Sequence, residues 1–133
     1  MPDIEPIHPS SGWRSASPYS PAVRAGGFLF VSGHVPVDPL TGFTVGEDIR
    51  AQTRQTLDNI RRTLEAAGVG PDRIVKTTVF LTNIADFAAM NAVYREFFAG
   101  ALPARSTVEV SALGRPEFRV EIEAVALVGE PGT

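Results

Sequence analysis

Apolar residues recur every three or four positions between residues 48 and 68, which is the spacing of an amphipathic helix. The repeating positions are Ile49, Thr53, Leu57, Ile60, Leu64 and Ala67. Glu47 or Asp48 would begin this helix, because an acidic side chain stabilises the positive end of the helix dipole. Gly68 would end it, because glycine adopts the left-handed conformation of a helix cap without strain.

A second stripe predicts another helix over roughly residues 85–98, with Asn83 as its N-cap. Its apolar positions are Phe87, Met90, Tyr94, Phe97 and Phe98. Asn91 lies within this stripe, and a buried amide side chain has to be hydrogen-bonded. Tying down a neighbouring backbone segment is the more common role for such a residue; contact with a substrate is the alternative.

Five further segments have the length and the apolar or alternating pattern of β-strands. They cover residues 19–24, 28–32, 74–82, 105–110 and 118–128. Ala25-Gly26-Gly27 joins the first two segments, and consecutive glycines tolerate the positive φ angles of a tight hairpin. Residues 28–31 are apolar on both faces, so we expect both faces to be covered.

The predicted elements follow the order ββαβαββ, which is typical of an α+β fold. We expect a two-layer sandwich in which one mixed β-sheet carries both helices on one face. The opposite face would carry Thr107, Glu109, Glu121 and Glu123 among apolar neighbours. A half-polar sheet face of this kind suits burial against other copies of the chain, so we expect a homo-oligomer.

Residues 1–17 are rich in proline, which removes amide donors, and in serine, which favours turns. We interpret them as an extended N-terminal arm without regular structure, and residues 18–133 as a single domain. Trp13 is the only tryptophan of the chain. We expect it to hold the arm against the body of the protein or against a neighbouring subunit.

The composition, with 133 residues of which 44% are hydrophobic and 20% charged, is that of one soluble domain. The absence of cysteine excludes disulfides, a thiol nucleophile and thiolate metal sites. The two histidines, His8 and His34, lie far apart and show no metal-ligating spacing. We therefore expect neither a metal nor another cofactor.

The formal net charge is −3, from 12 Lys and Arg against 15 Asp and Glu, and the basic residues are scattered. Binding to nucleic acid needs a concentrated positive face, so nucleic acid is not an expected partner. The longest apolar runs are too short to cross a bilayer, and the acidic N-terminus lacks a signal-peptide pattern. We expect a cytoplasmic protein that does not engage a membrane.

Arg105 stands where a loop interrupted by Pro103 becomes a strand. A guanidinium at such a junction is well placed to hold a planar carboxylate through two parallel hydrogen bonds. If the last two strands pair, Glu121 would be its cross-strand ion partner, which is the more common arrangement for two such residues. The alternative is a functional pair, with Arg105 gripping an anion and Glu121 acting as a general acid or base.

Tyr19, Ser32 and Asn91 are the other polar candidates for a site. His34 follows Ser32 by two residues on a strand, which is a poor arrangement for a nucleophile and its base. The sequence therefore does not favour a serine-based hydrolytic site.

Several segments, taken together and in order, have a recognisable combination of motifs. They are Ser32-Gly33, Val75-Lys76-Thr77-Thr78-Val79-Phe80-Leu81, Asp86-Phe87, Asn91-x-x-Tyr94-x-x-Phe97-Phe98, Pro103-Ala104-Arg105-Ser106 and Val120-Glu121-Ile122-Glu123-Ala124. With this set the chain resembles the RidA family, also called the YjgF family, over roughly residues 18–128.

The resemblance implies a chorismate-mutase-like fold and a homotrimer with three clefts between its subunits. It implies hydrolytic deamination of reactive enamine and imine intermediates of the 2-aminoacrylate type, giving 2-keto acids and ammonia. Arg105 would hold the carboxylate of this small-molecule substrate, and Glu121 would position or activate water. The residues that would line or support the cleft are Tyr19, Ser32, Gly33, Asn91 and Thr107.

This sequence departs from the family pattern at two positions and in its N-terminal arm, which contains Trp13 and is longer than in compact members. Thr107 stands where the family often has cysteine, and His34 stands where many members have glutamine. Two other functions stay open for a chain that resembles this family. One is a regulatory module that binds small carboxylates without turnover, and the other is the endoribonuclease or translation-inhibitor activity often attached to the family.

Overall fold

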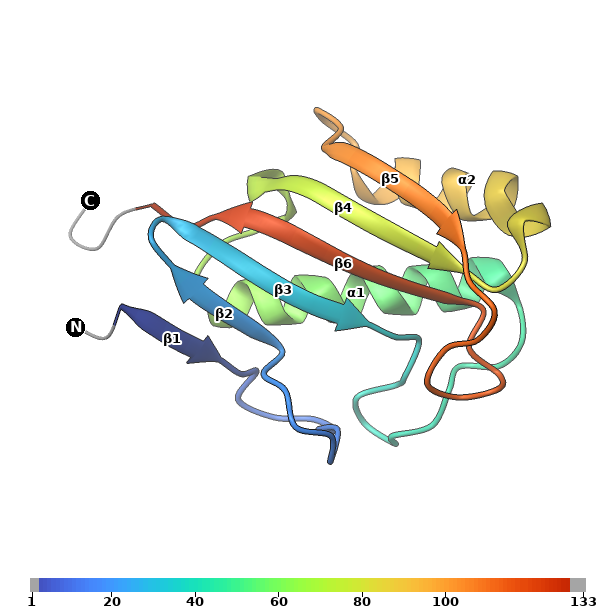
Figure 1. Cartoon of the computed structure of the whole chain (residues 1–133), viewed down its shortest axis with the longest axis horizontal. Helices are drawn as coiled ribbons and strands as arrows, with labels where there is room; N and C mark the ends of the chain where they lie inside the picture. Colours follow the sequence, from blue (N-terminus) through green and yellow to red (C-terminus); the bar gives the residue numbers. More distant parts are fainter. Residues whose placement is uncertain (1–2, 130–133) are drawn as a thin grey trace.

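The computed structural model describes residues 3–129, which form one mixed sheet with both helices packed on the same face (Figure 1). The strands lie in the order β1-β2-β3-β6-β4-β5, and all neighbours are antiparallel except β4 and β5. The strands are β1 (Ile4–Ile7), β2 (Ala22–Ala25), β3 (Phe28–His34), β4 (Ile74–Leu81), β5 (Ala104–Glu109) and β6 (Val120–Leu127). The helices are α1 (Ile49–Ala66) and α2 (Phe87–Phe97), with short 3₁₀ turns η1 (Pro71–Arg73) and η2 (Ile84–Asp86). The predicted α+β two-layer fold is confirmed.

Helix α1 begins and ends where its sequence predicts. Asp48 is the N-cap, and its Oδ1 accepts a hydrogen bond from the backbone N–H of Arg50. Gly68 follows the helix with a φ angle of 82°, the left-handed conformation of a cap. The apolar stripe of α1 packs on the sheet, so that Leu57, Ile60 and Leu64 are fully buried.

Helix α2 is shorter than predicted because η2 takes the place of its first turn. Asn83 caps this 3₁₀ turn as expected, since its Oδ1 accepts the N–H of Ala85 at 2.9 Å. Met90 and Tyr94 of α2 are buried against the sheet, whereas Phe87 stays 40% exposed. Within residues 3–129, neither helix is long and apolar enough to cross a membrane.

The N-terminal arm contains a strand, so the expectation of an arm without regular structure is wrong for residues 4–7. β1 pairs antiparallel with β2, and Ile7 lies in the hydrophobic core. The free backbone edge of β2 and the apolar side chain of Ile7 together outweigh the missing amide donor of Pro6 within the strand. Residues 1–2 and 130–133, at the outer ends of the predicted arm and domain, lie outside the described residues.

Strand β5 pairs with β4 and not with β6, because β4 lies between them. The prediction that the last two strands pair is therefore wrong. Thr107 and Glu109 lie opposite Val79 and Leu81 of β4, which are fully buried beneath the helices. Residues paired in this way share a face, so Thr107 and Glu109 face the helix layer and not the open face as expected.

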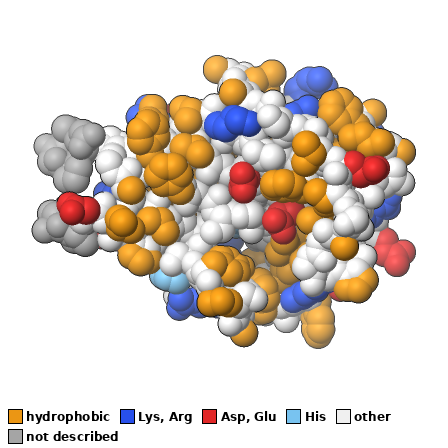
Figure 2. All heavy atoms as spheres, viewed as in Figure 1, with side chains coloured by type: hydrophobic (Ala, Val, Ile, Leu, Met, Phe, Trp, Pro, Cys, Tyr) orange, Lys and Arg blue, Asp and Glu red, His pale blue; other side chains and the backbone are white. Residues whose placement is uncertain are grey.

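The open face of the sheet carries large apolar side chains. Phe28 is 45% exposed, Phe30 49% and Val108 42%, whereas Leu29 and Val31 on the helix side are buried. Figure 2 shows this face with hydrophobic side chains gathered over the strands and acidic side chains near the middle. A single chain thus covers only one of the two faces of residues 28–31 that were expected to be buried.

Candidate functional site

A β-bulge at the end of β3 shapes the first part of the site. Val31 pairs with Ala124 and His34 with Ile122, so two residues of β3, Ser32 and Gly33, stand opposite one residue of β6. The extra residue turns the side chain of His34 toward α1 and leaves Gly33 beside Glu121. A Cβ atom at Gly33 would overlap the Glu121 carboxyl group, coming within 2.8 Å of its carbon. Only glycine leaves room for the carboxyl group in this position.

Glu121 lies on the open face of the sheet, at one wall of a hollow of about 430 Å³ that we call the Glu121 hollow. The residues lining it are Trp13, Ser15, Ser17, Tyr19, Ser32, Gly33, Val35, Gly114, Arg115, Phe118 and Glu121. Burial raises the pKa of Glu121, and the negative charge of Glu123 raises it further. A carboxyl group with a raised pKa can exchange protons closer to neutral pH than an ordinary glutamate.

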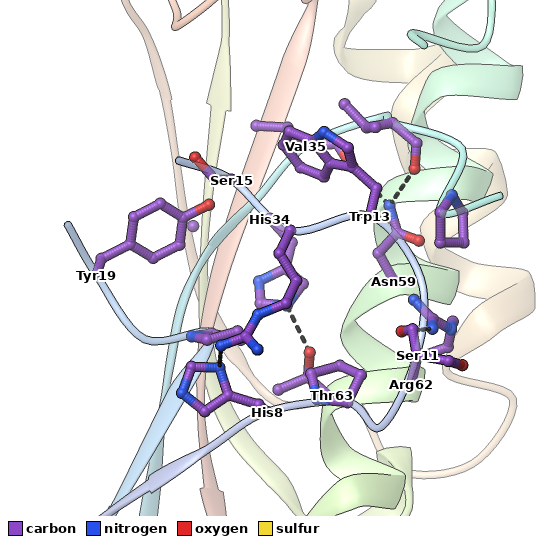
Figure 3. Close-up of a pocket in the computed structure, with 16 residues that line it drawn as sticks. His8, Ser11, Trp13, Ser15, Tyr19, His34, Val35, Asn59, Arg62 and Thr63 are labelled. Carbon is purple, nitrogen blue, oxygen red and sulfur yellow. Dashed lines mark hydrogen bonds between the residues drawn. The ribbon is translucent and has the colours of Figure 1, made fainter. Parts of the chain in front are cut away.

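Ser32 and His34 do not form a nucleophile and its base. The Ser32 hydroxyl donates to the carbonyl oxygen of Ser20 at 2.6 Å, and His34 Nδ1 donates to the Ser32 carbonyl oxygen at 2.6 Å. His34 Nε2 therefore accepts from the Thr63 hydroxyl at 2.8 Å (Figure 3). Burial lowers the pKa of His34, so both hydrogen bonds belong to a neutral ring.

The arm is held against the body by its tryptophan, as predicted. The backbone N–H of Trp13 donates to the carbonyl oxygen of Pro39 at 2.7 Å, and the indole ring packs on Gly42. Arg115 lies between the rings of Trp13 and Phe118, at 5.5 and 5.3 Å from their centres. Arg115 and Phe118 were missed as site residues, because neither the turn at Arg115 nor the start of the predicted strand at Phe118 gives a sign that this segment closes over the arm.

Arg105 lies on the other face of the sheet, under α2. Its guanidinium carbon is 4.8 Å from the ring centre of Tyr94 and 5.5 Å from that of Phe87. The Tyr94 hydroxyl is hydrogen-bonded to the Thr77 hydroxyl at 2.6 Å, which fixes the ring beside the guanidinium. Within residues 3–129, the guanidinium of Arg105 forms no ion pair or hydrogen bond, so its N–H groups are free to bind a ligand.

Two buried polar atoms near Arg105 lack a hydrogen-bond partner among the described residues. They are Oδ1 of Asn91 and Oγ1 of Thr107. Asn91 lies on the same face of α2 as Phe87 and Tyr94, and Thr107 follows Arg105 by two residues on one face of β5. The expectation that Asn91 ties down a neighbouring backbone segment is wrong, and an unpartnered buried oxygen favours contact with a ligand. We call Asn91, Arg105 and Thr107 the Arg105 cluster.

The seven predicted site residues thus fall into two groups. Tyr19, Ser32, Gly33 and Glu121 line the Glu121 hollow on the open face, and the Arg105 cluster lies on the helix side. Across β4, Arg105 stands level with Thr77 and Glu121 with Phe80. The cross-strand ion pair of Arg105 with Glu121 is therefore excluded within one chain. No group of three or more His, Asp or Glu side chains in residues 3–129 could hold a metal ion.

The chain is similar to many known proteins and solved structures. Residues 11–128 match the family described as Endoribonuclease L-PSP. A RutC family protein of Pyrococcus horikoshii is 48% identical over 122 residues, covering 92% of this chain and 96% of the relative. The 2-iminobutanoate/2-iminopropanoate deaminase of Salmonella typhimurium is 47% identical over 113 residues, covering 83% and 87%. The crystal structure of YyfA, a Rid-family protein of Yersinia pestis, superposes with a TM-score of 0.89 at 45% identity, covering 93% and 98%.

Proposed function

The chain belongs to the Endoribonuclease L-PSP family, the family of the YjgF and Rid proteins, and on this premise we propose that it is an enamine and imine deaminase. It would hydrolyse intermediates of the 2-aminoacrylate type to 2-keto acids and ammonia. Relatives named 2-iminobutanoate/2-iminopropanoate deaminase at 46–47% identity support the reaction class. The observation that carries the proposal is the unpaired guanidinium of Arg105 on the same side of the sheet as the unpartnered oxygens of Asn91 and Thr107.

Arg105 suits a substrate carboxylate. Its guanidinium is oriented by two aromatic rings and has no carboxylate partner within the described residues. A bidentate, charge-assisted contact contributes roughly 1.5–3 kcal/mol. Asn91 Oδ1 and Thr107 Oγ1 can accept hydrogen bonds, which suits the nitrogen of an enamine or iminium group.

Glu121 suits the transfer of protons to and from water. As a carboxylate it takes a proton from a water molecule, whose oxygen bonds to the carbon of the protonated imine and gives a neutral carbinolamine. The resulting carboxylic acid gives that proton to the amine nitrogen. The regenerated carboxylate then takes the hydroxyl proton as the C=O bond forms, the C–N bond breaks and ammonia leaves. The raised pKa of Glu121 brings its proton exchange closer to neutral pH than that of an ordinary glutamate. Since the imine carbon is already electrophilic, the step needs positioning and no covalent nucleophile.

The two groups of residues act together only if they come from different subunits. We propose that the open face of the sheet packs against other copies in a trimer, with the Arg105 cluster of one copy facing the Glu121 hollow of the next. The exposed Phe28, Phe30 and Val108 supply apolar surface for such an interface. This arrangement would also cover residues 28–31 on their second face.

The test is the release of 2-keto acid from a serine or threonine dehydratase reaction to which the protein is added. We expect faster release with the wild-type protein and a loss of at least about tenfold in the Arg105→Ala variant. Binding of 2-ketobutyrate without any acceleration would replace the deaminase by a carboxylate-binding regulatory module. RNA cleavage that survives in the Arg105→Ala, Glu121→Ala double variant and disappears on further purification would identify a contaminating nuclease.

A further inference from the structure

A second cavity, which we call the arm pocket, is lined by residues of the arm, of β3 and of α1 (Figure 3), and it shares Gly33 with the lining of the Glu121 hollow. It has a volume of about 100 Å³ and lies between the arm, the end of β3 with the loop that follows it, and α1. The hydrogen bond from Thr63 to His34 spans from α1 to β3 beside it. None of the residues discussed as binding or transforming the substrate, apart from Tyr19 and Gly33, belongs to this pocket.

The polar lining of the arm pocket is entirely basic or neutral. Arg14, Arg62, His8 and His34 line it, and none of its lining residues is Asp or Glu. The chain as a whole has a formal net charge of −3, so this concentration of basic groups runs against its overall balance. Two arginines without an acidic partner in the pocket favour an anion.

Both arginines keep free donors. Arg14 Nη2 donates to Nδ1 of His8 at 2.7 Å, and Arg62 Nη2 donates to the carbonyl oxygen of Ser11 at 2.7 Å. Neither guanidinium has a carboxylate partner among residues 3–129. Each therefore has N–H groups left for a ligand, and each is already oriented by one hydrogen bond to the arm.

The remaining walls of the pocket are mostly apolar. Trp13, Pro21, Val37 and Pro39 contribute flat or small hydrophobic surfaces. An inorganic ion would leave these surfaces without a partner, whereas an organic anion would use both kinds of wall. The chemistry thus fits a small carboxylate with a flat apolar body.

We propose that the arm pocket is a second ligand site, for a small organic carboxylate, and that its occupant influences the Glu121 hollow through the shared wall. Trp13, Tyr19 and Gly33 line both cavities. A ligand that packs on one side of Trp13 and Tyr19 restricts their positions on the other side. The proposal concerns binding in the arm pocket and stands independently of deaminase activity.

The test is a titration of the full-length protein with benzoate, with benzamide as a neutral ligand of the same shape. Trp13 is the only tryptophan and His8 and His34 are the only histidines. The imidazole NMR signals report on the arm pocket alone, whereas tryptophan fluorescence reports on both cavities that Trp13 lines. We expect a saturable change in all three signals with benzoate and at least about tenfold weaker binding of benzamide. Equal binding of the two ligands, or no saturable change with benzoate, overturns the proposal.

Variants locate the binding. Arg14→Gln and Arg62→Gln are each expected to weaken benzoate binding at least about tenfold. Arg50→Gln, which removes an exposed arginine from α1 outside the pocket, should leave binding unchanged. Arg105→Ala should also leave benzoate binding unchanged. Loss of benzoate binding in Arg105→Ala would assign benzoate to the Arg105 cluster and overturn the proposal that it binds in the arm pocket. Because benzoate and benzamide are compared on the wild-type protein, the proposal is tested even if a variant loses its fold.

Discussion

Arg105 and Glu121 extend from opposite faces of one sheet, on strands that β4 separates. No side-chain rotation within one chain brings a guanidinium through the sheet to a carboxylate on its other face. If both groups act on one substrate, each site must combine Arg105 of one copy with Glu121 of another.

Mixed oligomers test this directly. Arg105→Ala and Glu121→Ala are each expected to be nearly inactive, but subunit exchange between them should restore about a quarter of the wild-type sites, by random assortment of two contributors. The measurement is keto acid release after mild dissociation and reassembly, with exchange verified by native mass spectrometry. As control, Arg105→Ala is mixed with the Arg105→Ala, Glu121→Ala double variant, which restores no site. Verified exchange without any recovery would contradict a shared site.

Gly33→Ala should displace the Glu121 carboxyl group. The new Cβ would come within 2.8 Å of the carboxyl carbon, and the neighbouring backbone of β3 and β6 is held by the sheet. We expect a loss of at least about tenfold in turnover with a destabilisation of about 1–3 kcal/mol. Gly100→Ala is the matched control, since a Cβ at Gly100 meets nothing within 4 Å. Wild-type turnover in Gly33→Ala would show that the position of this carboxyl group is unimportant.

Glu123→Gln should shift the acid limb of the pH–rate profile to lower pH. Burial is the main cause of the raised pKa of Glu121, and the charge of Glu123 is the second. Removing that charge lowers the pKa of Glu121, so the carboxylate needed as a base persists to lower pH. The profile of kcat/KM reports this pKa in the free enzyme. Glu65→Gln, which changes an exposed residue of α1 on the helix side, should leave the acid limb in place. An unshifted acid limb in Glu123→Gln would show that the protonation of Glu121 does not control the rate.

The sequence predicted the elements of the fold better than their neighbours in the sheet. The period of α1, its cap at Asp48 and its end at Gly68 are local features, and the structure confirms all three. Whether β5 pairs with β4 or β6 depends on chain connections across the whole sheet, and no local pattern encodes that choice. The prediction that Thr107 lies on the open face was wrong for the same reason, because it followed from the assumed pairing.

The candidate site was predictable as a set of residue types and not as a geometry. Arg105 and Glu121 were proposed together, yet only the strand order shows that they lie on opposite faces. The bulge that turns His34 toward α1 also has no clear signature, because Ser32-Gly33-His34 reads equally well as a regular strand end. Arg115 enters the site through a turn that packs on the arm, a contact between segments about 100 residues apart.

His34→Gln should flatten the pH dependence of stability between pH 7 and 5. Burial lowers the pKa of His34 in the folded protein, whereas the unfolded chain binds a proton near the ordinary value of 6.5. Below this value the unfolded state binds more protons than the folded state. The free energy of unfolding of the wild-type protein therefore decreases as the pH is lowered, by at most about 1.4 kcal/mol per pH unit. A glutamine amide can still donate to the Ser32 carbonyl oxygen but does not titrate. Urea unfolding from pH 5 to 8 measures this difference between the two proteins. At pH 8 the imidazole is neutral in both the folded and the unfolded state, so a difference in stability there reports a change in packing. Equal slopes in both proteins would show that His34 is protonated without cost in the folded state.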